Sequence, residues 1–146
     1  MKRIRLVSIA IATLVAAATP ALASEPFSDG GNSCATADGF YPYGQNGTIG
    51  YAGDIDYYVL RFTGCGTLNI GSTGTTDTYG YLLDANCRVI AQNDDANGSY
   101  NFNISGRLNA GVYYLAVRHY NRFGTGNYRL GFTFAAGASG QCGICR

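Results

Sequence analysis

Apolar and polar residues alternate along short stretches of this chain, and no helical periodicity of useful length appears after residue 23. Alternation with a period of two is typical of strands that bury one face. Turn residues separate these stretches at the spacing expected of two packed sheets. The predicted strands cover residues 47–51, 57–62, 68–70, 79–83, 89–92, 100–104, 112–118 and 128–134. We therefore expect an all-β fold, an antiparallel β-sandwich of about eight strands.

The turns between these strands fall into two groups if each strand runs antiparallel to its neighbour in sequence. One end of the domain then holds the turns 64–66, 84–87 and 109–111. The opposite end holds the loops 53–56, 72–78, 93–99 and 119–127. The second end collects most of the acidic and amide side chains, so we expect it to carry an ion site if there is one.

Clustered carboxylates repel one another unless a cation lies among them, and hard oxygen ligands from loops suit Ca²⁺. The alternative is that these side chains cap turns and stay hydrated. The predicted calcium ligands are Asp54, Asp56, Asp77, Asn93, Asp94 and Asp95. An ion at this place is expected to stabilise the loops and not to catalyse a reaction.

The N-terminus has the features of a secretory signal peptide over residues 1–23. Lys2 and Arg3 precede an apolar run over residues 6–18, and residues 21–23 form a small-x-small cleavage site. The run is too short to span a bilayer, and no second apolar stretch follows it. We therefore expect a secreted or periplasmic protein without membrane insertion after cleavage.

Beyond the signal peptide we expect an N-terminal arm over 24–45, one sandwich domain over 46–134 and a cysteine-containing tail over 135–146. The chain has ten Lys and Arg against nine Asp and Glu, a formal net charge of +1. This balance gives no electrostatic case for nucleic acid, whose binding proteins carry basic patches.

Five cysteines in a chain with a signal peptide favour disulfides in an oxidising compartment. The turns that hold Cys65 and Cys87 fall at the same end of the domain, so we predict a Cys65–Cys87 bridge. Cys34 could pair with Cys142 or Cys145, or Cys142 and Cys145 could pair and leave Cys34 free. The sequence does not decide between these arrangements.

Catalysis has little support in the sequence. Cys142 and Cys145 have CxxC spacing, but a redox site needs a helix N-terminus within a βαβ frame, and a disulfide fits this tail better. His119 is the single histidine, and no nucleophile context of the Gly-x-Ser-x-Gly kind accompanies it. We expect no catalytic residues and no organic cofactor.

Exposed Tyr and Arg side chains on a sheet favour recognition of a protein or a sugar. Tyr57 and Arg61 share one strand face, and Arg118 and Tyr120 share another. These four residues are the predicted ligand surface. The alternative is that half or more of the tyrosines belong to the core, since Tyr is common inside sandwiches.

Several short motifs occur in the order found in one bacterial family. They are Gly53-Asp54-Ile55-Asp56-Tyr57-Tyr58, Ser72–Asp77, Asn93-Asp94-Asp95, Leu108–Leu115 and Gly126–Leu130. Over residues 45–134 the chain resembles the pre-peptidase C-terminal domain. The resemblance implies a jelly-roll-like β-sandwich of a kind usually appended to secreted proteases, with relatives in collagenases that bind Ca²⁺ and collagen.

No protease domain precedes the module in this sequence, so we expect a stand-alone secreted member. The expected function is a non-catalytic module, stabilised by calcium, that binds an extracellular protein or polysaccharide. The main alternative is an accessory, folding or inhibitory partner that acts in trans on a secreted protease. A small hydrolase is the remaining alternative.

Overall fold

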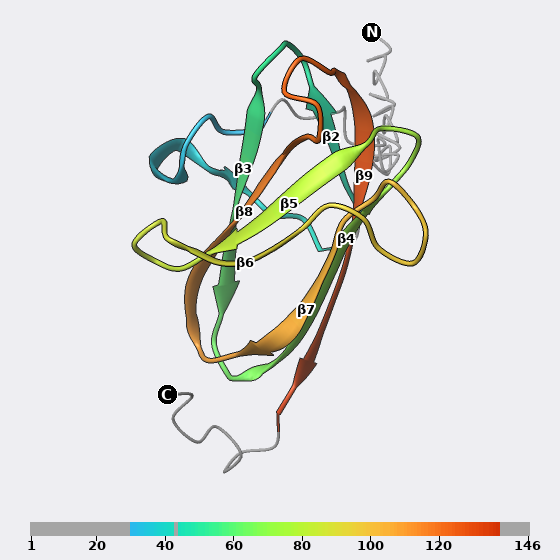
Figure 1. Cartoon of the computed structure of the whole chain (residues 1–146). Helices are drawn as coiled ribbons and strands as arrows, with labels where there is room; N and C mark the ends of the chain where they lie inside the picture. Colours follow the sequence, from blue (N-terminus) through green and yellow to red (C-terminus); the bar gives the residue numbers. More distant parts are fainter. Residues whose placement is uncertain (1–29, 43, 138–146) are drawn as a thin grey trace, which may run out of the picture.

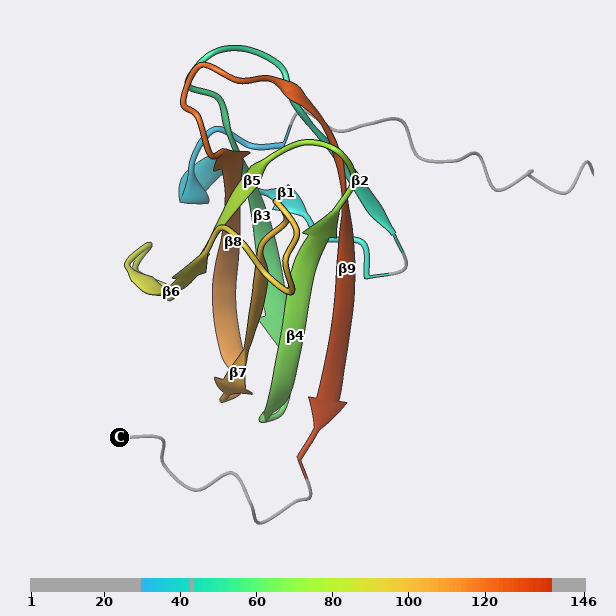
Figure 2. The ribbon, with the colours of Figure 1, turned by 45° about the vertical axis from the view of Figure 1, so that its right-hand side comes forward.

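The computed structural model describes residues 30–42 and 44–137, which form nine strands and one short 3₁₀ helix, Cys34–Thr36 (Figure 1). The five-stranded sheet has the order β1 (Asp38–Gly39), β3 (Ile55–Phe62), β8 (Gly111–His119), β5 (Thr78–Leu83) and β6 (Val89–Asn93). The four-stranded sheet has the order β2 (Gln45–Ile49), β9 (Gly126–Ala136), β4 (Gly66–Thr73) and β7 (Asn103–Leu108). Figure 2 shows the two sheets packed face to face, which confirms the predicted all-β sandwich.

Antiparallel pairing fixes which loops share an end of the sandwich. Strand β1 runs parallel to β3, and the other strand pairs are antiparallel in the described part of the chain. Ile55 is paired with Arg118, and Thr78 is paired with His119. The loops before β3, before β5 and after β8 therefore meet at one end, as predicted. The loop after β6 reaches the same end, where Thr78 N donates to Tyr100 O (2.9 Å).

The core lies between the sheets and follows the alternation seen in the sequence. In β3, Tyr58 and Leu60 are buried, whereas Tyr57 and Val59 stay partly exposed on the outer face. The largest fully buried apolar side chains are Tyr58, Tyr128, Phe102, Ile49, Leu68, Ile70, Leu115 and Val117. Burying one such side chain contributes about 1.5–3 kcal/mol relative to exposure, so this layer holds the two sheets together.

Residues 30–42, predicted to be part of a loose arm, instead pack against the five-stranded sheet. Gly31 exchanges two backbone hydrogen bonds with Tyr57 (3.2 and 2.7 Å). Strand β1 adds to the edge of the sheet beside β3, and the Phe40 ring lies 5.2 Å from the Phe132 ring at the margin of the core. The segment lacks apolar alternation because it contributes only two paired residues, so the sequence pattern did not reveal it.

Cys87 forms a disulfide with Cys34, and the predicted Cys65–Cys87 bridge is wrong. Strand β5 ends at Leu83, opposite Tyr114, before the level of the sandwich at which the turn holding Cys65 lies. The Cys87 turn therefore meets the N-terminal segment. Cys65 is buried and is disulfide-bonded, but not to Cys87.

Other predictions are corrected or fall outside the described residues. The arrangements that left Cys34 free or joined it to the tail are wrong. The sixth predicted strand, 100–104, is shifted, since β7 begins at Asn103. The signal peptide and the Cys142–Cys145 pair lie outside the described residues. Within the described ranges no helix is long and apolar enough to cross a membrane.

Candidate functional site

Asp56, a predicted calcium ligand, lies in the core and not in a surface loop. It is the second residue of β3, on the same face as Tyr58, and it is 0 % exposed. Tyr128 of β9 donates its hydroxyl hydrogen to Asp56 Oδ2 (2.5 Å), so Tyr58 is the donor to the Tyr128 hydroxyl (2.9 Å). Burial raises the pKa of both tyrosines, and the Asp56 carboxylate adds to the effect. This hydrogen-bonded chain joins the two sheets.

Asp54 shapes the loop that leads into β3. Its side chain is almost fully buried, and its Oδ2 accepts a hydrogen bond from Gly50 N (2.7 Å). Its Oδ1 has no hydrogen-bond partner among the described residues. The contact with Gly50 is the turn-forming role that was the alternative to metal binding.

Asp77, Asp94 and Asp95 form the acidic group at the loop end. Burial is the main cause that raises the pKa of Asp77; His119 lowers it, while Asp95 and Asp94 raise it further. Asp77 Oδ1 is buried and accepts no hydrogen bond from the described part of the chain. This carboxylate is therefore the least satisfied of the three.

The six predicted calcium ligands do not form one cluster. Asp56 is held inside the sandwich by Tyr128, and Asn93 Oδ1 accepts a hydrogen bond from Asn103 N (2.8 Å), which fixes the start of β7. No three His, Cys, Asp or Glu side chains of the described residues are placed to hold a metal ion. The predicted six-ligand cage does not fit this arrangement, and calcium binding stays a prediction.

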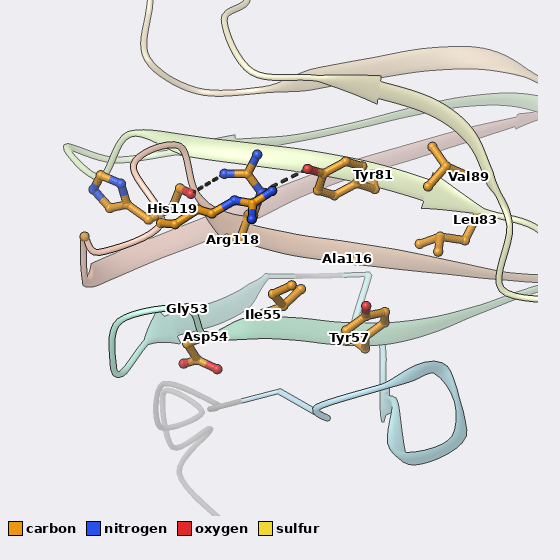
Figure 3. A pocket seen from close by; sticks show the side chains of 12 residues that line it. Gly53, Asp54, Ile55, Tyr57, Tyr81, Leu83, Val89, Ala116, Arg118 and His119 are labelled. Carbon is orange, nitrogen blue, oxygen red and sulfur yellow. Dashed lines mark hydrogen bonds between the residues drawn. The ribbon is translucent and has the colours of Figure 1, made fainter.

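A cleft of about 360 Å³ opens on the outer face of the five-stranded sheet (Figure 3). Ala116 of β8 lies at its floor and is paired with Tyr57 of β3 on one side and with Tyr81 of β5 on the other. Because an alanine stands between two tyrosines, the sheet surface is hollow there. Leu83 and Val89 make one end of the cleft apolar, and the opposite end is polar.

Arg118 is fixed in place at the polar end of the cleft. Its Nε donates to the Tyr81 hydroxyl (2.9 Å), and its Nη1 donates to the carbonyls of His119 (2.7 Å) and Tyr120 (2.8 Å). The guanidinium carbon also lies 4.4 Å from the ring centroid of Tyr79, within cation–π range. These contacts restrain the side chain, which therefore offers a guanidinium group of defined orientation.

Arg122 lines the same end of the cleft from the loop after β8. The loop backbone is held by Gly53 N, which donates to Arg122 O (2.6 Å), and by Phe123 N, which donates to Asn121 Oδ1 (3.1 Å). Within the described part of the chain the Arg122 side chain makes no hydrogen bond or ion pair. Together with Arg118 it makes this end of the cleft cationic.

The predicted ligand-surface residues are divided between two places. Tyr57 and Arg118 line the cleft, and the Tyr120 ring stacks beside it, 6.4 Å from the Tyr79 ring. Arg61 is exposed further along β3 and lines a different cleft, of about 410 Å³, at the opposite end of the strand. Sharing a strand face therefore did not bring Arg61 to the site.

His119, at the polar end of the cleft, is held by a hydrogen bond within its own loop. His119 Nδ1 accepts a hydrogen bond from Asn121 N (3.1 Å), and a Cβ added to Gly124 would lie 2.4 Å from the imidazole ring. The cysteines of the described residues are all disulfide-bonded, so none of them offers a thiolate. The cleft therefore has the groups of a binding site, with aromatic walls and fixed donors.

The fold is similar to two solved structures. One is the pre-peptidase C-terminal domain of collagenase from Bacillus anthracis, with 21% identity and a TM-score of 0.53 over 66% of this chain and 91% of that one. This chain has the pre-peptidase C-terminal fold. The other is PliG of Aeromonas hydrophila, a periplasmic inhibitor of g-type lysozyme, with 16% identity and a TM-score of 0.51 over 62% and 83% of the two chains. No family model and no curated protein matches the sequence.

Three residues of the cleft in this pre-peptidase C-terminal fold were missed by sequence reasoning: Tyr81, Ala116 and Arg122. The spacing of Tyr79 and Tyr81 placed two tyrosines on one strand face, which was a usable signal. The order β3-β8-β5, which sets Ala116 between two tyrosines, joins strands that are distant in sequence. The alternation of apolar residues within one strand does not predict which strands become its neighbours in the sheet.

Proposed function

We propose that this protein is a secreted or periplasmic, non-catalytic binding module that holds an extracellular protein or polysaccharide in the cleft of the five-stranded sheet. The observation that carries the proposal is that two arginines and two tyrosines line the same cleft. Neither arginine has an acidic partner among the described residues. Tyr and Arg are the residues most enriched at the centres of recognition surfaces.

Two further observations support the proposal. The Cys34–Cys87 disulfide suits an oxidising compartment. The two solved structures of similar fold are a domain of a collagenase and an inhibitor of a lysozyme, and neither name describes a catalytic domain. The fold is therefore compatible with a domain that contacts another macromolecule.

The test is a binding panel of collagen, other extracellular proteins and polysaccharides, with Arg118→Ala as the cleft variant. Arg129→Ala is the matched control, because Arg129 is exposed on the outer face of the four-stranded sheet, where its Nε donates to Asn46 Oδ1 (3.2 Å). We expect a saturable ligand whose affinity falls at least about tenfold in Arg118→Ala and is unchanged in Arg129→Ala. Equal affinities of the two variants would place the binding surface elsewhere.

A second candidate function is inhibition of a secreted enzyme in trans, and the loop after β8 supports it. Phe123 at its tip is 83 % exposed, although the loop backbone is held by hydrogen bonds to Gly53 and Asn121. A rigid loop with an exposed aromatic side chain loses little entropy when it enters a pocket of a partner. PliG shows that the fold occurs in an inhibitor of g-type lysozyme.

The inhibitor candidate is tested by adding the protein to g-type lysozyme and to secreted proteases and measuring the rate of substrate hydrolysis. We expect Phe123→Ala to relieve the inhibition. Tyr100→Ala is the control, because Tyr100 is also highly exposed, at 70 %, but belongs to a different loop. Full enzyme rates at saturating protein would exclude this second candidate for the enzymes assayed.

Calcium stabilisation remains part of the proposal, but only for the loop end. The buried Oδ1 of Asp77 supports it; Asp94 and Asp95 act on Asp77 as neighbouring charges but do not form with it a group of three placed to hold an ion. Asp54 and Asp56 are left out, since each carboxylate accepts a hydrogen bond from another part of the protein. An ion at the loop end would need backbone or water oxygens to complete its coordination.

A further inference from the structure

The charges that line the cleft narrow the class of ligand. The ion pair Arg88–Asp84 lies beside Leu83 and Val89 at the apolar end of the cleft, so it involves neither Arg118 nor Arg122. Asp54 lines the same cleft, but Figure 3 shows its carboxylate turned away from Arg118. The polar end of the cleft therefore carries positive charge that an anionic ligand would balance.

The donors of Arg118 suit a carboxylate. A guanidinium group has five N–H donors, and three of them are used by the Tyr81 hydroxyl and two backbone carbonyls. The two N–H groups of Nη2 have no partner within the described ranges. Since Arg118 is already held by its other nitrogens, little entropy is lost when these two N–H groups bind an oxygen ligand.

The shape of the cleft suits a ring. The hollow over Ala116 is bounded by Tyr57 and Tyr81, and the whole cleft, with a volume of about 360 Å³, falls in the range of small-molecule sites. The side chain of a partner's Asp or Glu carries its carboxylate on one or two methylene groups and would leave most of this volume empty. A uronic acid carries the carboxylate on a six-membered ring with hydroxyl groups, which can fill the hollow and reach the tyrosine hydroxyls.

We propose, resting on the binding function above, that this cleft binds a uronic acid unit of an acidic polysaccharide. The carboxylate contacts Arg118 and Arg122, and the sugar ring lies over Ala116 between Tyr57 and Tyr81. The cleft thus recognises a ligand that carries one negative charge next to a sugar ring. A neutral polysaccharide of the same ring shape lacks the group that the arginines need.

The probe is a short oligogalacturonate, and its methyl ester is the matched control because esterification removes the charge and keeps the ring. Binding is measured by calorimetry with the oxidised protein at low and high salt. We expect the ester to bind at least about tenfold more weakly, and the affinity for the acid to fall with added salt. Equal binding of acid and ester would overturn the proposal.

Two variants locate the site. Arg122→Ala removes an exposed side chain without partners among the described residues, so the fold is kept, and we expect about a tenfold loss of affinity. Ala116→Phe fills the hollow and is expected to abolish binding, while Arg129→Ala leaves it unchanged. An oligogalacturonate affinity that is the same in Arg122→Ala and the unmodified protein would overturn the proposal.

The outcomes separate this inference from the proposed function. If polyglutamate binds in the cleft and oligogalacturonate does not compete with it, the ligand is an acidic protein segment; the uronate inference then fails and the binding function stands. If no member of the binding panel is sensitive to Arg118→Ala or Ala116→Phe, the proposed function of the cleft fails as well.

Discussion

Asp56 and Asp77 each have a carboxylate oxygen that water does not reach, but they differ in what surrounds it. The other oxygen of Asp56, Oδ2, accepts a hydrogen bond from Tyr128, and Gly30 covers the side chain, since a Cβ added to Gly30 would lie 2.6 Å from Asp56 Cβ. Asp77 Oδ1 accepts no hydrogen bond from the described residues, and two further carboxylates raise its pKa. One aspartate is part of the core, and the other lies at the loop end with less hydrogen bonding from the described residues.

The position of an acidic residue on a strand or in a loop decides its role more than the residue type does. A strand residue takes the environment of its face, which for Asp56 is the interior, and the fold must then supply hydrogen bonds. A loop residue such as Asp77 stays close to solvent and can bind ions or other charged groups. A substitution in either environment therefore changes the free energy of unfolding by a measurable amount.

The largest effect is expected from the disulfide that anchors the segment covering Asp56. The double variant Cys34→Ser with Cys87→Ser removes a cross-link between residues 53 positions apart, which in the chain-entropy model lowers the free energy of unfolding by about 4 kcal/mol. The segment that contains Gly30 and Gly31 is then held less firmly over Asp56, and the Asp56 carboxylate becomes more accessible to water. Urea denaturation measures the loss.

Hydrogen exchange at the Tyr57 amide is the local check on that disulfide. This amide donates to Gly31 O (2.7 Å), so it exchanges faster if the covering segment detaches. The Tyr128 amide, on the other sheet, is the internal control, and its exchange rate should change only with the global stability of the protein. Unchanged protection at Tyr57 relative to Tyr128 would contradict the anchoring role of the disulfide.

Tyr128→Phe is expected to lower the free energy of unfolding by about 3 kcal/mol, because the buried Asp56 carboxylate loses the hydrogen bond to its Oδ2 and Tyr58 loses its acceptor. Tyr58→Phe is the matched control: it removes the terminal donor only and should cost about 1 kcal/mol. Chemical denaturation of both variants at pH 7 gives the two values. Equal losses would show that the hydrogen bond to Asp56 is no stronger than the one between the tyrosines.

Asp77→Asn is expected to raise the free energy of unfolding slightly at pH 7 in EDTA, since it removes a charge that burial penalises. A raised pKa means that the folded state holds the Asp77 proton more tightly than the unfolded state. Stability is therefore present below the ordinary pKa of 3.8 and declines as the pH rises through the raised pKa. Thermal unfolding from pH 3 to 7 should show a smaller decline in the variant, and identical profiles would contradict this.

The alternation of apolar residues predicted most of the fold because each strand buries one face. The same alternation predicts that Asp56 is buried, because Asp56 lies on the strand face of Tyr58 and Leu60, which both belong to the core. The prediction assigned residues 53–56 to a loop, so it did not apply the alternation of the strand to Asp56. The start of β3 at Ile55 is the fact that turns Asp56 from a loop ligand into a core residue.

The disulfide and the cleft, each formed by segments distant in sequence, could not be predicted. The Cys34–Cys87 disulfide depends on a two-residue strand that has no periodic signal, and β5 is short enough to move Cys87 away from Cys65. The cleft depends on Ala116 standing between tyrosines of two other strands. Single-strand patterns specify faces, and the order of strands in a sheet comes from packing of the whole chain.

Calcium is expected to have the smallest effect and separates the two aspartates most directly. Few carboxylates are near Asp77, so we expect weak binding of the kind found in extracellular modules, and a stabilisation of about 0.4 kcal/mol at a free concentration equal to the dissociation constant. The gain should vanish in Asp77→Asn and persist in Tyr128→Phe, which alters only the interior. Melting temperatures in EDTA and in millimolar Ca²⁺ measure it. A gain that persists in Asp77→Asn would place the ion away from Asp77, and no gain in the unmodified protein would leave Asp77 without an ion.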